Sequence, residues 1–310
     1  MDHTNNNKWG IIYCPRTNGQ RQKRLWQRIE RSLKAENIEY KHVESNAIEN
    51  VKPLMKTMIE NGYQTIIIVG GDSALNNAIN YLIKTDFQTQ QKIQLGVIPN
   101  GWSNEFAHFW NFNEHTPEET IRRLKLKQTK KIDLGYITYK NNNGEQCRKY
   151  FLNCITIGLA TSIIALRRKA KRMGGLKTIS YIYHSIKMIL RRLEYKMKMQ
   201  INEDEISGKV MTVSIGNANG YGLTPNAVPY NGFLDASVIH HPKMTQLIEG
   251  LYLLYSGKIL NHKDVLPFRT KKVIIKDTGK APISIDGRLV KLPKSEYEIG
   301  IRQEAINFLM

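Results

Sequence analysis

Two glycines and an aspartate follow directly after the most aliphatic run of the chain. The run covers residues 65–69, and Gly70, Gly71 and Asp72 come next. Glycines at the end of a buried strand let backbone N–H groups approach a phosphate, and the N-terminus of a following helix adds positive potential. The pattern predicts a phosphate-binding loop whose aspartate handles a metal ion or a proton. An ordinary turn is the alternative.

A second polar loop has the same placement. It follows the apolar run 95–98 and leads into a helix, with the residues Pro99, Asn100, Gly101, Trp102, Ser103 and Asn104. Because the carboxyl ends of parallel strands meet at one edge of a sheet, we expect its tip beside the first loop.

Two later segments are rich in turn residues. One covers 216–222 and continues at 225–235, and the other is Asp286-Gly287-Arg288. Taken singly, each is an ordinary β-turn. The order and spacing of all four segments are more informative than any one of them.

The elements that position these segments change character near residue 131. Before it, strands alternate with helices, which predicts a parallel sheet with ligand sites at the strand carboxyl ends. The strands are expected at 9–13, 38–43, 65–69 and 95–98, and the helices at 20–36, 52–61 and 74–83. After it, short alternating segments predict a mostly antiparallel β unit. Its strands are expected at 136–139, 150–157, 209–215, 233–239, 272–275, 283–285 and 297–301, its hairpin tip at 141–144, and its helices at about 161–198 and 243–256.

The composition is that of a globular protein with an unusual charge. Of 310 residues, 46 are Lys or Arg and 27 are Asp or Glu, so the formal net charge is +19. Such an excess favours a polyanionic partner, although a basic solvated surface is the alternative. No apolar run approaches the ~20 residues that span a bilayer, and the polar start lacks an apolar signal core, so a cytoplasmic location is expected. Three cysteines without CxxC spacing argue against a disulfide framework and a cysteine zinc site.

Together, the four segments resemble the diacylglycerol kinase / sphingosine kinase-like family of bacterial lipid kinases, whose catalytic fold is related to that of NAD kinases. The family's GGDGT-x-N loop is matched at 70–76 and its P-x-GTxNDFAR loop at 99–108. Its IDLG, F-N-x-x-x-x-G, P-x-A-x-x-x-DGxLD and DGE motifs are matched, the third in outline, at 132–135, 151–158, 225–235 and 286–288. The resemblance covers nearly the whole chain.

The resemblance implies a fold of the α/β plus β class. An NAD-kinase-like α/β N-terminal domain is expected at 1–131, joined by the C-terminal strand at about 297–310. A C-terminal antiparallel β-sandwich-like domain for the lipid substrate is expected at 132–296.

The resemblance also implies a reaction and a set of site residues. Such enzymes transfer the γ-phosphoryl group of ATP to a lipid alcohol with the help of Mg²⁺, and the acceptor here is diacylglycerol-like or a sphingoid base. The implied catalytic residues are Asp72, Asp286 and Arg288. The implied metal ligands are the backbone carbonyls of Val228 and Phe233 and the side chain of Asn231. The implied nucleotide-binding residues are Ser45, Gly70, Gly71, Asp72, Ser73, Ala74, Leu75, Asn76, Gly101, Trp102 and Asn104.

Five positions depart from the family pattern. Ser73 replaces a glycine, Ala74 and Trp102 replace threonines, Asn231 replaces the metal-binding aspartate, and Arg288 replaces the glutamate of DGE. One hypothesis is that Arg288 takes over part of the charge neutralisation by the metal, which predicts a weaker dependence on Mg²⁺. The alternative is a catalytically lapsed homologue that binds lipid or protein at anionic membranes.

Two basic stretches point to a membrane partner. Residues 161–200 combine eleven Lys or Arg with an apolar stripe at helical spacing, and 122–131 hold a second cluster. Such stretches suit an anionic membrane surface, although solvated charge on a packed helix is the alternative. No zinc-finger or RRM-type signature favours a nucleic acid. We therefore expect a cytoplasmic protein that is peripheral to the membrane. A homodimer stays open.

Overall fold

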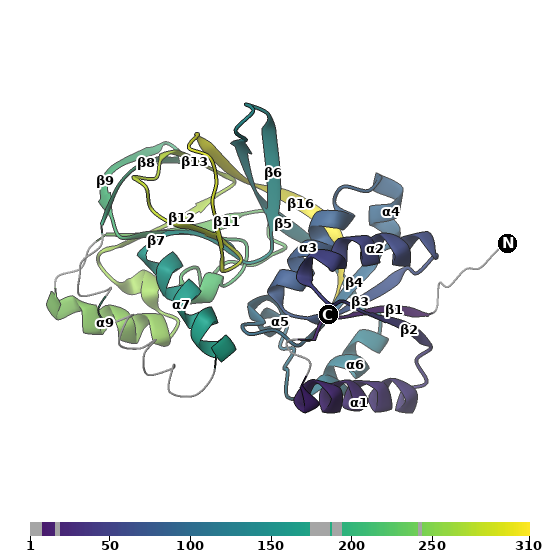
Figure 1. Cartoon of the computed structure of the whole chain (residues 1–310). Coiled ribbons are helices and arrows are strands. Elements are labelled where there is room, and N and C mark those ends of the chain that lie inside the picture. The colour runs from purple at the N-terminus through teal and green to yellow at the C-terminus, as the bar shows by residue number, and fades with distance from the viewer. Residues whose placement is uncertain (1–7, 16–18, 174–186, 188–193, 241–243) are drawn as a thin grey trace. The chain divides into compact units, whose positions relative to one another are not determined.

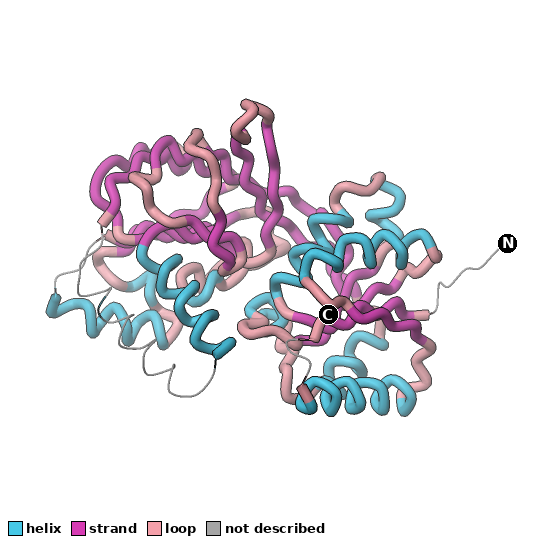
Figure 2. The backbone as a smooth tube through the Cα atoms, in the orientation of Figure 1, coloured by secondary structure: helices cyan, strands magenta, loops and turns pink. Residues whose placement is uncertain are grey.

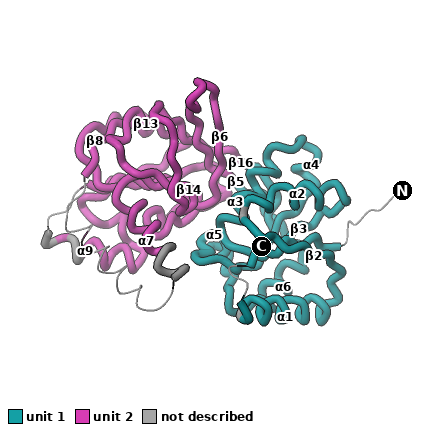
Figure 3. The backbone as a smooth tube through the Cα atoms, in the orientation of Figure 1, with its two compact units in different colours: residues 1–132, 304–310 teal, residues 133–303 magenta. Residues whose placement is uncertain are grey.

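The structure is a computed structural model that describes residues 8–15, 19–173, 187, 194–240 and 244–310. It divides into two compact units, shown in different colours in Figure 3. Unit 1 comprises residues 1–132 and 304–310, and unit 2 comprises residues 133–303. The sequence analysis expected the boundary at 131 and assigned the strand at about 297–310 to the first unit. In the structure, only the last seven residues of the chain, 304–310, belong to unit 1.

Unit 1 is built on a parallel sheet with the strand order β2-β1-β3-β4. The strands are β1 (Trp9–Tyr13), β2 (Tyr40–Glu44), β3 (Thr65–Gly70) and β4 (Gln94–Pro99). The end of β16 (Tyr297–Leu309) adds a further parallel partner, since Asn307 and Phe308 pair with the start of β4. Ile66, Ile67 and Ile68 are all fully buried, which explains why β3 is a continuous aliphatic run.

Helices cover both faces of this sheet. Figure 1 shows α1 and α6 on one face and α2 and α3 on the other. The helices of the unit are α1 (Gln20–Ala35), α2 (Val51–Glu60), α3 (Asp72–Leu82), α4 (Phe87–Lys92), α5 (Glu105–Phe109) and α6 (Pro117–Lys125), with a 3₁₀ turn η1 (Ile48–Asn50). The predicted alternation of strand and helix is confirmed here.

Unit 2 is dominated by antiparallel strands (Figure 2). One sheet has the order β12-β11-β10-β7-β14-β15, and the other joins β9, β8, β13 and the first half of β16, with β5 and β6 beside β16. One apolar core combines residues of both sheets, such as Ile155 and Val213 from the first and Met199 and Val273 from the second. The strands are β5 (Thr129–Lys140), β6 (Gln146–Phe151), β7 (Cys154–Gly158), β8 (Tyr195–Ile201), β9 (Asp204–Val210), β10 (Thr212–Gly216), β11 (Leu234–Ile239), β12 (Val265–Thr270), β13 (Lys272–Asp277), β14 (Ile283–Ile285) and β15 (Arg288–Val290).

Helices are few among the described residues of unit 2. They are α7 (Leu159–Met173), α9 (Met244–Tyr255) and the 3₁₀ turns η2 (Gly220–Gly222) and η3 (Ile259–Asn261). Within the part of the chain that the structure describes, no helix is long and apolar enough to cross a membrane. The predicted α/β unit followed by an antiparallel β unit is confirmed.

The predicted helix at 161–198 is wrong at its C-terminal end, because β8 begins at Tyr195. From there the residues alternate, with Met197, Met199 and Ile201 buried, which is the pattern of a strand and not of a helix. Most of the apolar stripe expected within 179–193 lies outside the described residues.

Further strand predictions also differ from the structure. The strand expected at 209–215 covers the end of β9 and most of β10, which are separated at Met211. The strand expected at 150–157 is two strands, β6 and β7, separated at Leu152 and Asn153. Strand β12 was not predicted, because Pro267 lies inside it. Proline is tolerated there because β12 is an edge strand that pairs only with β11.

Candidate active site

The two glycine loops of unit 1 touch each other. A Cβ atom added to Gly71 would lie 2.5 Å from the Cα of Gly101, so neither position has room for a side chain. The Asn100 N–H donates to the Gly70 carbonyl over 2.8 Å, which extends the pairing of β3 and β4 into the loops. The prediction that the second loop lies beside the first is confirmed.

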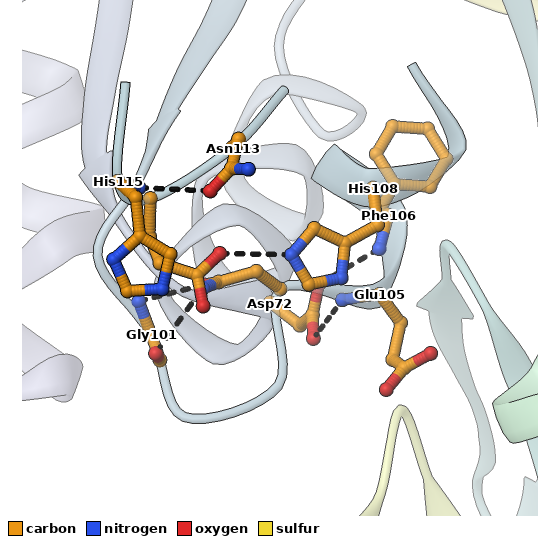
Figure 4. A network of polar contacts seen from close by, with 9 residues as sticks. Asp72, Gly101, Glu105, Phe106, His108, Asn113 and His115 are labelled. Atoms are coloured by element: carbon orange, nitrogen blue, oxygen red, sulfur yellow. Dashed lines mark hydrogen bonds and ion pairs between the residues drawn. The ribbon is translucent and has the colours of Figure 1, made fainter. Parts of the chain in front are cut away.

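Asp72 joins the first loop to the start of helix α5. Its two carboxylate oxygens accept the N–H groups of Glu105 and Phe106, each over 3.1 Å (Figure 4). The side chain is only 8% exposed. Two orphan donors at a helix start are thereby satisfied by a charged acceptor. Asp72 therefore positions α5, and the catalytic role expected from the sequence stays a prediction.

Asn104 fixes the shape of the second loop. Its Oδ1 accepts the Gly101 N–H over 2.6 Å, and its Nδ2 donates to the Gly101 carbonyl over 3.2 Å. Asn104 has a φ of 58°, a left-handed conformation that asparagine tolerates better than most residues. The residue is buried, and Trp102 lies half-buried in the turn that Asn104 closes.

The first turn of helix α3 starts directly at the glycine contact. Gly71 is its N-cap, in extended conformation, and the Ala74 and Leu75 N–H groups both donate to the Gly71 carbonyl. The side chains of Ala74 and Leu75 are buried in the unit. The predicted contact of Ala74 and Leu75 with a nucleotide is therefore limited to their backbone atoms. The side chains of Ser73 and Asn76 are half-buried.

Cys14 and Ser45 complete this edge of the sheet. The Cys14 N–H donates to the Val69 carbonyl over 2.8 Å, and the Ser45 hydroxyl donates to the Ala47 carbonyl over 2.6 Å. Burial raises the pKa of the Cys14 thiol to about 12, against a smaller lowering by a hydrogen bond with Ser45. The thiol is therefore neutral at physiological pH. The sequence analysis did not place Cys14 at the site, although its position directly after β1 was a usable signal.

The helix that follows the second loop makes a side-chain contact with the segment after it. His108 Nε2 lies 2.9 Å from a carboxylate oxygen of Glu114. The pair ties α5 to the segment that follows it. This contact supports a structural role for His108.

In unit 2, Asp286 is the most firmly held acidic side chain of the predicted site. Its Oδ1 accepts the N–H groups of Asn153 and Cys154 at 2.8 and 3.2 Å, and its Oδ2 accepts that of Leu152 at 3.0 Å. The side chain is 2% exposed. A carboxylate has about four acceptor positions, so three amide donors leave little capacity for a further proton.

Asp286 and Gly287 are the two central residues of the β14–β15 hairpin. Their φ angles are 46° and 69°, and Ile285 pairs with Arg288 across the turn. Two consecutive positive φ angles are the signature of a type I′ turn, for which Asp-Gly is a preferred sequence. The exposed Arg288 is thereby placed at the first position after the turn.

Tyr221 lies against this turn and was not predicted. Its hydroxyl oxygen occupies the space that a side chain at 287 would need. Tyr221 itself has a φ of 60°, between two glycines that also have positive φ. A non-glycine residue in that conformation is strained. The only sequence signal was its place between Gly220 and Gly222.

Comparison with known proteins agrees with the division of the chain into two units. The model of the diacylglycerol kinase catalytic domain matches residues 8–137, and that of the YegS C-terminal NAD kinase beta sandwich-like domain matches residues 155–306. The chain belongs to the diacylglycerol kinase family.

Other members and neighbours of the diacylglycerol kinase family are distant in sequence. A diacylglycerol kinase of Staphylococcus carnosus is 20% identical over 284 residues, 89% of this chain and 87% of that protein. A diacylglycerol kinase structure from Bacillus anthracis has a TM-score of 0.67 at 16% identity and covers 99% of this chain and 97% of that one. Yeast NADH kinase complexed with NADH has a TM-score of 0.52 at 8% identity, with 97% and 83% covered. The two structures show an NAD-kinase-like fold for this diacylglycerol kinase family member.

The resemblance implied a Mg²⁺ ion at Val228, Asn231 and Phe233. Asn231 Oδ1 accepts the Phe233 N–H over 2.9 Å, and the Val228 carbonyl accepts the Tyr230 N–H over 2.8 Å. All three donors are neutral, whereas Mg²⁺ sites in proteins depend on carboxylates.

Asp133 is an acidic residue that forms a hydrogen bond with this segment, since its Oδ2 accepts the Gly232 N–H over 2.7 Å. No cluster of three His, Cys, Asp or Glu side chains occurs among the residues that the structure describes. The residues present therefore do not fit a resident Mg²⁺ ion in this member of the diacylglycerol kinase family.

Proposed function

We propose that this chain is an ATP-dependent lipid kinase that phosphorylates a diacylglycerol-like alcohol. The observation that carries the proposal is the contact of the Gly71 and Gly101 loops at the start of helix α3. The contact requires glycine at both positions, so neither residue places a side chain over the backbone at the N-terminus of α3, where the helix favours a bound phosphate. The family supports a kinase, and the names of the relatives support diacylglycerol as the acceptor.

In the proposed reaction, the bond between the γ-phosphorus and the β-γ bridging oxygen breaks. A bond forms between that phosphorus and the acceptor oxygen, ADP leaves, and the hydroxyl proton of the acceptor is released to water. Such transfers depend on positioning and charge neutralisation more than on covalent help from the protein. Mg²⁺ enters with the nucleotide, as part of the substrate. The reaction then needs no strong base from the protein. This agrees with the state of Asp286, whose carboxylate already accepts three backbone N–H groups.

Arg288 is the residue that distinguishes this chain chemically. A guanidinium group can neutralise charge on transferring phosphoryl oxygens, as an acidic residue at this position cannot. We propose that Arg288 has this role. The role replaces part of the charge neutralisation that the family resemblance assigns to a protein-bound metal ion.

The test is transfer of label from ATP labelled in its γ-phosphate to detergent-dispersed dioctanoylglycerol, measured in the organic extract. We expect labelled lipid, and a loss of about 10²–10³-fold in kcat for Arg288→Gln. Lys291→Gln is the matched control, since it removes an exposed cation close in sequence. Absence of labelled lipid, with ATP bound, would contradict the proposal and favour a lapsed kinase.

A further inference from the structure

Helices α1 and α6 concentrate the positive charge of unit 1. Residues 20–36 and 117–131 together hold twelve cations against four acidic residues, which accounts for eight of the nineteen net positive charges. The cations are Arg21, Lys23, Arg24, Arg28, Arg31, Lys34, Arg122, Arg123, Lys125, Lys127, Lys130 and Lys131. So many positively charged side chains close together are either solvated or in contact with an anionic partner.

The two helices lie side by side on one face of the sheet (Figure 1). Arg28 bonds both carboxylate oxygens of Glu118, at 3.0 and 2.9 Å, and Lys125 lies 3.0 Å from Glu36. These ion pairs connect α1 to α6. The cations of both helices therefore belong to one surface, which we call the α1–α6 face.

Ion pairs engage three of the four acidic residues of the α1–α6 face, and only Glu119 has no cationic partner among the described residues. Glu36 and Glu118 are engaged between the helices, and Glu30 lies 3.7 Å from Lys34. Five exposed cations have no acidic partner among the described residues: Lys23, Arg24, Arg31, Arg122 and Lys127. Even the ion pairs on a protein surface add little stability. The cations without an acidic partner are therefore not needed for the fold.

An exposed leucine stands among these cations. Leu126, at the end of α6 between Lys125 and Lys127, is 67% exposed. Apolar residues flanked by lysines are typical of segments that enter the headgroup region of a bilayer while the cations meet lipid phosphates. Surfaces that bind single-stranded nucleic acids combine cations with exposed aromatic rings on which the bases stack. On α1 the Trp26 ring is half-buried, with ring centroids 4.9 Å from Tyr13 and 4.4 Å from His42.

We propose that the α1–α6 face docks on membranes that contain anionic lipid, with Leu126 inserted at the headgroup level. The choice of a membrane rests on the proposed function, since a diacylglycerol-like acceptor resides in the bilayer. The interaction is electrostatic and therefore weakens as ionic strength rises.

The test is co-sedimentation of the full chain with vesicles of phosphatidylcholine alone or with added phosphatidylglycerol, without ATP. Binding is expected only to the anionic vesicles. Neutralising Lys23, Arg24, Arg122 and Lys127 to Gln lowers vesicle affinity on the order of 100-fold or more, since each cation near such a surface contributes roughly fivefold. Leu126→Ser lowers affinity about fivefold or more, with the salt dependence unchanged.

The matched control neutralises four exposed lysines of unit 2, namely Lys196, Lys198, Lys280 and Lys291. Both quadruple variants carry the same net charge. An equal loss of vesicle affinity in both would overturn the proposal, because net charge and not the α1–α6 face would then be responsible. Full vesicle affinity of the α1–α6 variant, with loss of binding to single-stranded RNA, would identify a nucleic-acid surface instead.

The outcome is independent of the kinase reaction. Vesicle binding is measured without nucleotide, and kinase activity is measured on detergent-dispersed acceptor. A chain that binds anionic vesicles through this face without phosphorylating lipid would remove the proposed function alone. A chain that phosphorylates dispersed lipid without binding vesicles would remove the docking surface alone.

Discussion

Asp72 is the clearest case in which a residue predicted for chemistry has a positional role in the structure. Its carboxylate spans two backbone N–H groups at the start of α5, and α5 follows the second glycine loop. A charged acceptor shared by two donors holds two segments that are far apart in the sequence. The arrangement of the two loops therefore depends on this side chain.

We expect Asp72→Asn to lower the free energy of unfolding by about 1–3 kcal/mol, because one amide donor would face an N–H group of α5. The kcat should fall less than about tenfold. Urea unfolding and the labelled-ATP assay measure the two effects. A loss of about 10²–10⁴-fold in kcat with unchanged stability would instead assign Asp72 to proton transfer.

Asp86→Asn is the matched control for this variant. Asp86 caps α4 by accepting the Thr89 N–H over 2.9 Å, and α4 carries none of the predicted site residues. Its replacement should leave ATP affinity and kcat unchanged.

Cys14 gives the site edge a pH dependence. The pKa of the buried thiol is raised to about 12 from its usual 9.0, so the native state holds this proton more tightly than the unfolded state. The stabilisation is complete below pH 9 and is lost as the pH rises towards about 12. Between pH 9 and 10, the free energy of unfolding should fall by about 1 kcal/mol more in the wild type than in Cys14→Ala. Urea titrations at both pH values measure this difference, and parallel slopes would show that the thiol ionises freely.

At the scale of elements, the contact of the two glycine loops is the feature on which nucleotide binding depends. Gly71 and Gly101 leave no space between their Cα atoms for a Cβ, and backbone cannot move aside as a flexible side chain can. Asn104 adds a second restraint on Gly101. The contact with Gly71 therefore restricts Gly101 sterically, and the hydrogen bond with Asn104 holds it in place.

We expect Gly101→Ala to separate the loops, because its Cβ would collide with Gly71 and with Asn104 Oδ1. Overpacking of this kind costs about 1–3 kcal/mol of stability. ATP affinity should fall about tenfold or more. Calorimetric titration measures the affinity, and unchanged ATP binding by the folded variant would exclude this loop from the nucleotide site.

Gly250→Ala provides the control for the glycine substitution. In α9, an added Cβ would meet nothing closer than 3.6 Å, and alanine is the better helix former. Its ATP affinity should equal that of the wild type.

The sequence predicted the strands of the unit 1 sheet and helices α1, α2 and α3 because each carried its own periodicity, whereas helices α4 and α6 were not predicted. The aliphatic run of β3 and the amphipathic spacing of α1 are local signals that tertiary packing did not override. Strand β8 was hidden because it follows a basic amphipathic stretch without a breaker, and β12 because it contains Pro267. The placement of both glycine loops after parallel strands was also sufficient to predict that Gly71 and Gly101 lie together.

Other parts of the candidate site depend on contacts that spacing does not encode. The three amide donors of Asp286 come from residues 152–154, more than a hundred positions earlier in the chain. The packing of Tyr221 against Gly287 is equally hidden from local sequence patterns. Long-range contacts of this kind determine what a motif residue can do chemically, and a single sequence does not show them.

At the scale of the whole molecule, the two glycine loops belong to unit 1, whereas the Asp286 hairpin and Arg288 belong to unit 2. The chain departs from the family pattern at Ala74, Trp102 and Asn231. Trp102 is the largest of these changes and lies within the second loop. Whether a nucleotide binds beside this indole decides between an active kinase and a protein that keeps only the fold.

The most direct test is a titration of the purified chain with ATP, with and without Mg²⁺, followed by thermal unfolding. A ligand that binds only the native state raises Tm with its concentration. The account predicts a saturable rise in Tm in the wild type and a much weaker one in Gly101→Ala. No change in Tm at millimolar ATP would contradict the nucleotide site and with it the proposed kinase.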